Sequence, residues 1–147
     1  MAKLVSRGPV RQVAIATHPV YNMLLPVPVV CFLGALLTDI AYLKSGGNFV
    51  WLDFSTWLLL AGLLVGGVAA VILLVDLIRT RDSRAEWRWA HPLFFYAALL
   101  VELLSMFVHQ RDGWTAVAGL GLILSIIGAA LVLLAGWFHR PGLEVVQ

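Results

Sequence analysis

The stretch His91–His109, HPLFFYAALLVELLSMFVH, decides the fold of this chain. Almost all of its residues are apolar, and its three ionisable side chains are His91, Glu102 and His109. At about 100° per residue, the steps from His91 to Glu102 and from Glu102 to His109 each return a helix to nearly the same direction. The stretch therefore predicts a membrane-spanning helix whose one polar face packs against protein, while its other faces meet lipid.

The composition of the whole chain supports a membrane protein. The 147 residues are 61% hydrophobic and only 12% charged, and the mean hydropathy is +0.93. Soluble domains carry about a quarter charged residues, so this chain has too few charges to cover a soluble globule. The single cysteine, Cys31, excludes an internal disulfide and a cysteine-based metal cluster. We expect one all-α integral membrane domain.

Four apolar segments predict a four-helix bundle. A basic segment at 1–17 precedes a transmembrane domain at 18–138, and a tail follows at 139–147; the predicted spans are 18–43, 53–78, 91–109 and 114–138. Prolines at 26 and 28 predict a kink in the first span that packs against protein. Small residues such as Gly62 and Gly66 allow close helix packing, within one copy or in a homo-oligomer.

The distribution of lysine and arginine predicts the orientation. The N-terminal segment, the loop after Ile78 and the tail hold three, four and one of them, and the other two loops hold one each. Eight against two places both termini in the cytoplasm. Glu102 then lies near the bilayer centre. The cytoplasmic side receives His18, Asp76, His91 and His139, and the outer side receives Asp39, Asp53 and His109.

The chain also predicts an internal repeat. The segments Thr17-His-Pro-Val-Tyr21 and Ala90-His-Pro-Leu-Phe94 each open a span that leads to a glycine-rich helix. Two repeated helical hairpins of this kind would place His18 and His91 at the same depth on different helices.

Several motifs appear in order along the first three spans. They are His18-Pro19, Pro26 with Pro28, Leu-Thr-Asp39, Trp57-Leu-Leu-Leu-Ala-Gly62, Asp76 and the histidine that opens the third span. Together they resemble the bacterial membrane-protein family catalogued as domain of unknown function 2231, over roughly residues 17–138. The resemblance implies a four-helix inner-membrane domain without an established activity. Some relatives have gene neighbours that encode quinoprotein sugar dehydrogenases, which favours a redox setting.

The chain departs from this family at three places. Leu73 stands three residues before Asp76, where the family more often has glycine. Neither the proline after His91 nor the acid Glu102 is a feature of the family. Any role of Glu102 therefore belongs to this chain.

The paired histidines suggest a b-type haem. Two imidazoles at one depth on facing helices suit bis-histidine ligation by His18 and His91, and Arg88 lies on the correct side to pair with a propionate. Such a subunit would exchange electrons with a partner dehydrogenase or a quinone. Each His-Pro pair is equally an ordinary helix start with its histidine at the wet interface, and both interpretations stay open.

Asp76 permits another interpretation of the same histidines. Added to His18 and His91, it would complete a two-histidine, one-carboxylate site for iron or zinc. It would equally serve as an ion-pair partner of Arg79.

Glu102 supports a non-redox alternative. With His91 and His109 it forms a polar stripe along one face of the third span, and ionisable residues inside a membrane mark proton or substrate pathways. Asp39 is a further polar intramembrane residue. The protein would then be an oligomeric proton-coupled carrier. Alternatively, a protonated Glu102 would hold helices together by bonding a carbonyl freed by Pro26 or Pro28, as in a membrane scaffold.

Other chemistries have no support in the sequence. It contains no glycine-rich phosphate loop, no nucleophile elbow and no cysteine-histidine zinc spacing. We therefore do not expect an enzyme acting on its own. The basic loop after Ile78 is expected to touch anionic lipid, not nucleic acid.

Overall fold

The computed structural model describes residues 19–79, 89–111 and 117–139. Its helices are α1 (Pro19–Leu24), α2 (Pro26–Lys44), α3 (Phe49–Arg79), α4 (Ala90–Arg111), a short π-helical turn η2 (Val117–Gly121) and α5 (Leu122–Phe138). Four helical stretches are long and apolar enough to cross a membrane: Pro19–Lys44, Phe49–Arg79, Ala90–Arg111 and Val117–Phe138. The prediction of an all-α membrane protein with four long apolar helices is confirmed.

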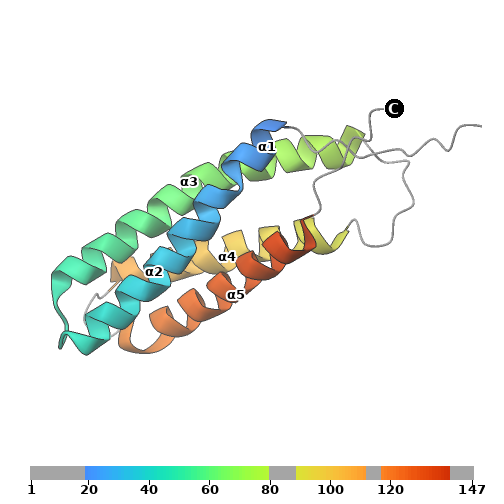
Figure 1. Ribbon diagram of the computed structural model, residues 1–147. Coiled ribbons are helices and arrows are strands. Elements are labelled where there is room, and N and C mark those ends of the chain that lie inside the picture. The colour runs from blue at the N-terminus through green and yellow to red at the C-terminus, as the bar shows by residue number, and fades with distance from the viewer. Residues whose placement is uncertain (1–18, 80–88, 112–116, 140–147) are drawn as a thin grey trace, which may run out of the picture.

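The long helices pack as a bundle (Figure 1). Helix α2 packs mainly on α3 and α4 on α5, and the two pairs meet along α2 with α5 and α3 with α4. Each helix buries residues at alternating spacings of three and four. On α4 the buried face is His91, Phe95, Ala98, Glu102, Ser105 and His109, the face that the sequence predicts to meet protein. This spacing is typical of helix bundles with knobs-into-holes packing.

The first span passes through Leu25 with helical backbone angles, φ −54° and ψ −39°. Helix α1 ends at Leu24 and α2 begins at Pro26, while the Leu25 N–H still donates to the Tyr21 carbonyl at 2.9 Å. Pro26 and Pro28 lack the N–H groups that would continue the helical ladder without interruption. Bonds of the ladder are therefore missing where the sequence predicts a kink, and the kink itself stays a prediction. Tyr21, one turn earlier on α1, is fully buried.

Two glycines on α3 set the distance to its neighbours. A Cβ at Gly62 would lie 2.6 Å from the Phe32 ring of α2, and one at Gly66 would lie 2.6 Å from a Leu99 methyl of α4. Both glycines are used inside the bundle, as the predicted small-residue contact requires. Apart from its chain neighbours and the backbone of its own helix, the neighbouring Gly67 has no described atom within 4 Å of its Cβ position. The predicted internal repeat and orientation stay predictions.

This contrast predicts a difference between two alanine substitutions. Gly62→Ala must push the buried Phe32 ring and α2 outward, and overpacking of this kind costs about 1–3 kcal/mol. Its apparent Tm in detergent should fall by several degrees. Gly67→Ala adds the same methyl group to the same helix without a collision and should keep the parent Tm. Equal Tm values for the two variants would contradict this packing.

Candidate functional site

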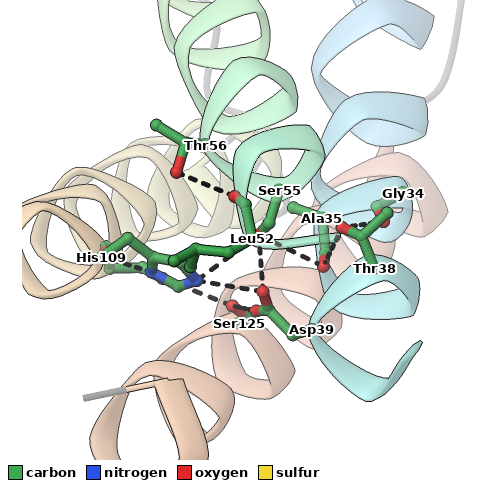
Figure 2. Close-up of polar contacts among 10 residues, drawn as sticks. Gly34, Ala35, Thr38, Asp39, Leu52, Ser55, Thr56, His109 and Ser125 are labelled. Carbon is green, nitrogen blue, oxygen red and sulfur yellow. Dashed lines mark hydrogen bonds and ion pairs between the residues drawn. The ribbon is translucent and has the colours of Figure 1, made fainter. Parts of the chain in front are cut away.

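One end of the bundle holds a buried pair of ionisable side chains. Asp39 on α2 faces His109 on α4, with His109 Nε2 3.0 Å from Asp39 Oδ1 and both side chains fully enclosed. The other ring nitrogen, Nδ1, lies 2.8 Å from the Ser105 carbonyl oxygen. The pair thus links two helices that are not adjacent in the bundle. Figure 2 shows the two side chains pointing toward each other.

Serine hydroxyls from the remaining two helices complete this cluster. Ser55 on α3 donates to Asp39 Oδ1 at 2.6 Å, and Ser125 on α5 donates to Oδ2 at 2.6 Å (Figure 2). Both serines are fully buried. The Asp39 carboxyl therefore receives a polar group from each of the other three long helices, and its oxygens need no water.

The hydrogen-bond partners limit where protons reside in the cluster. A carbonyl oxygen only accepts, so His109 Nδ1 carries a hydrogen toward Ser105. Ser55 and Ser125 each give their hydrogen to Asp39. One further proton lies between Asp39 Oδ1 and His109 Nε2. Whichever atom holds it, the pair has no net charge, which suits the apolar interior.

Glu102 lies deeper in the bundle than Asp39, and its carboxyl lacks the hydrogen bonds that Asp39 has. It stands about 18 Å from the start of α4 and about 14 Å from its end, with 0% of its surface exposed. Neither carboxyl oxygen has a hydrogen-bond partner among the described residues. The predicted bond to a carbonyl freed by Pro26 or Pro28 is therefore not present there.

Gly128 on α5 makes room for this carboxyl. A Cβ at that position would collide with Oε1, Cδ and Cγ of Glu102. Ser105 follows Glu102 by three residues on α4, and Ser125 precedes Gly128 by three on the antiparallel α5. Their hydroxyl oxygens lie 3.3 Å apart. A polar column thus leads from this serine pair to Asp39 and His109, and Glu102 lies about one helical turn beyond the pair without a hydrogen bond to it.

The opposite end of the bundle holds a second polar cluster. The Tyr21 hydroxyl lies 2.5 Å from His91 Nε2, and His91 Nδ1 lies 2.7 Å from the Ala135 carbonyl oxygen. His139, directly after α5, places Nε2 2.9 Å from Asn22 Oδ1. The His91 and His139 ring centroids are 4.8 Å apart. Two histidines thus tie α1 to α4 and to the end of α5.

The chain matches the family model described as "Predicted membrane protein (DUF2231)" over residues 17–144. It belongs to this family. The resemblance drawn from the motifs is thereby confirmed. The chain matches no curated protein and no solved structure.

Of the two predicted haem ligands of this DUF2231 protein, the structure describes only His91. His18 and Arg88 lie outside the described residues. His91 Nδ1 donates its hydrogen to the Ala135 carbonyl, so Nε2 carries the lone pair. The Tyr21 hydroxyl donates a hydrogen bond to that lone pair. A haem iron would reach His91 only after Tyr21 moved. The haem site stays a prediction.

Of the three ligands predicted for an iron or zinc ion, the structure describes Asp76 and His91. Asp76 lies near the end of α3, and its two histidine partners would be His18 and His91. Within 19–79, 89–111 and 117–139, no three histidine, cysteine, aspartate or glutamate side chains gather to hold a metal ion. Because His18 falls outside these ranges, this site also stays a prediction.

Sequence reasoning missed most partners in the two clusters. It named Asp39, Glu102 and His109 as separate intramembrane residues but did not pair Asp39 with His109. Neither Ser55 nor Ser125 was recognised as a partner of Asp39, although each follows the three-and-four spacing of the buried face of its helix. That spacing is the signal that would have found them.

The Asp39 cluster predicts a strong effect on stability. Asp39→Asn keeps the shape but removes the charge, and it leaves His109 in the interior without its ionic partner. Breaking a buried pair costs about 3–5 kcal/mol, so the apparent Tm in detergent should fall markedly. Asp53→Asn, at an exposed acid of α3, should leave it unchanged. The double variant Asp39→Asn/His109→Gln should lose less than the sum of the single variants, and simple additivity would contradict the pairing.

His139 predicts a dependence of stability on pH. Burial, and next the charge of His91, lower the pKa of His139 below its ordinary value. The folded protein thus favours neutral His139, so its contribution to stability is present above about pH 6.5 and is lost as the pH falls below that value. The apparent Tm should drop on acidification, and His139→Gln should reduce this drop. An identical pH profile for the two proteins would refute this role.

Proposed function

We propose that this protein is a proton-coupled membrane carrier that binds the transported proton at Glu102. The observation that carries the proposal is the buried Glu102 carboxyl, which lies midway along α4 and has no hydrogen-bond partner among the described residues. An ionisable group at this depth is expensive to bury. A carboxyl that served only to hold helices together would be expected to bond a neighbouring group, as Asp39 does.

The polar column supports proton access from one end of the bundle. Hydroxyl groups both donate and accept hydrogen bonds, so the serine pair Ser105 and Ser125 is suited to pass a proton between Glu102 and the Asp39–His109 pair. The lysine and arginine count along the sequence predicts that this entrance faces outward.

A layer of apolar side chains favours a carrier mechanism and argues against an open channel. Between Glu102 and His91, the inward-facing residues of α4 are Phe95 and Ala98, both fully buried. Phe95 packs in a cluster of apolar side chains from the other helices that includes Leu25, Ala69, Leu73 and Ala135. A proton on Glu102 therefore has a polar route on one side only, and release on the other side needs a rearrangement.

Proton uptake into vesicles tests this function. Purified protein in liposomes that contain a pH-sensitive dye should acidify the interior when a potassium diffusion potential, negative inside, is applied. Glu102→Gln preserves size and removes the titrating group, so we expect uptake to fall at least tenfold. Asp53→Asn, an acid-to-amide change at an exposed position, should transport like the parent. Parent rates equal to those of empty liposomes, or an active Glu102→Gln variant, would contradict the proposal.

A second candidate function is electron transfer through a b-type haem. One observation favours it: the His91 Nδ1 bond to a backbone carbonyl is the arrangement that orients histidine ligands and presents Nε2 to a metal. His18 would supply the other axial ligand. Protein produced with ample haem should then show a Soret band and sharp reduced bands that are lost in His91→Ala. A flat visible spectrum would refute this function and leave the carrier.

A further inference from the structure

We propose that Glu102 also binds a sodium ion in place of its proton, with the hydroxyl oxygens of Ser105 and Ser125 as further ligands. The carrier would then move either cation, and sodium and the proton would compete for this one carboxyl. This inference rests on the proposed function, because it names the ion that competes with the proton at the same carboxyl.

The Glu102 carboxyl lacks a described partner whether it is protonated or ionised. If it is protonated, its O–H has no acceptor among the described residues, and if it is ionised, neither oxygen has a donor or a cation there. A buried polar group left in this way costs about 1–3 kcal/mol, and more when it is charged. A small bound species that supplies the missing partner would remove this cost.

Oxygen atoms for such a ligand lie within one helical turn. The serine pair is about 4.5 Å along the bundle from Glu102, and its two hydroxyl oxygens are 3.3 Å apart. Beyond it, Asp39 Oδ2 is 2.6 Å from Ser125 Oγ. Carboxylate and hydroxyl oxygens are the ligands that hard cations prefer. The described ligands thus match an alkali or alkaline-earth ion and contain no sulphur.

The charge balance selects a monovalent ion. The Asp39–His109 pair is neutral as a unit, and the other side chains around it on α3 and α5 are the uncharged Ser55 and Ser125. An ionised Glu102 then contributes the single uncompensated charge of this described interior. A monovalent cation neutralises it, whereas a divalent cation would leave a net positive charge in an apolar bundle, which is strongly unfavourable.

The tight fit selects a small ion. The Glu102 carboxyl packs against Gly128, in the space that a Cβ there would need, so an ion bound to it would lie in a closely packed part of the bundle. Sodium is smaller than potassium and suits this space better. Exchange of H⁺ for Na⁺ at Glu102 moves no net charge into or out of the interior.

Thermal stability in detergent tests the binding site directly. Sodium chloride should raise the apparent Tm by several degrees over choline chloride at the same ionic strength, and potassium chloride should raise it less. The shift should shrink at acidic pH, where protons compete for Glu102. Glu102→Gln should abolish the difference between the salts, and Asp53→Asn should keep it. Equal Tm values in the sodium and choline salts would overturn the inference.

Transport separates this inference from the proposed function. Liposomes loaded with sodium chloride and diluted into choline chloride at equal pH should acidify inside as sodium leaves and protons enter, without an imposed potential. The potential-driven proton uptake described above is measured on the same vesicles. Uptake driven by the potential without any response to the sodium gradient would overturn the sodium site and keep the carrier. Absence of both responses would overturn both.

Discussion

The buried contact between Asp39 and His109 is the interaction on which the arrangement of the bundle depends. Lipid offers no hydrogen-bond partners, so an intramembrane polar group must find its partners within the protein. Here α2 supplies the carboxylate, α4 the imidazole, and α3 and α5 one hydroxyl each. Apolar side chains permit many rotations of one helix against another, whereas this cluster is complete only when all four faces meet. The contact therefore fixes which faces turn inward.

The two buried acids of the bundle have opposite environments. Asp39 is saturated by a histidine and two serines, while Glu102, deeper in the same column, has no hydrogen-bond partner among the described residues. The first arrangement stabilises one packing of the helices. The second leaves a buried carboxyl without a hydrogen-bond partner, and the proposed binding of a proton or sodium ion rests on this. Gly128 supports this difference, since its missing side chain admits the carboxyl without supplying a donor or an acceptor.

The sequence predicted the bundle because membrane helices are governed by length and apolarity. The inward face of α4, from His91 to His109, followed from helical periodicity alone. The pairing of Asp39 with His109 did not, because the sequence places both near one membrane face without saying which faces of α2 and α4 meet.

Ser55, Ser125 and the bond between Tyr21 and His91 were harder to predict. Serine and tyrosine are common in membrane helices, and their role depends on the packing of distant segments. Tyr21 and His91 are 70 positions apart in the chain, so no local pattern predicts their contact.

The most direct test of the central claim is infrared difference spectroscopy of the protein in lipid during a step of external pH. If Glu102 takes up and releases protons, a carboxyl C=O band should rise and fall with the step and vanish in Glu102→Gln. The band should persist in Asp53→Asn. A pH step that produces no carboxyl band dependent on Glu102 would show that this side chain does not exchange protons, and would contradict the account.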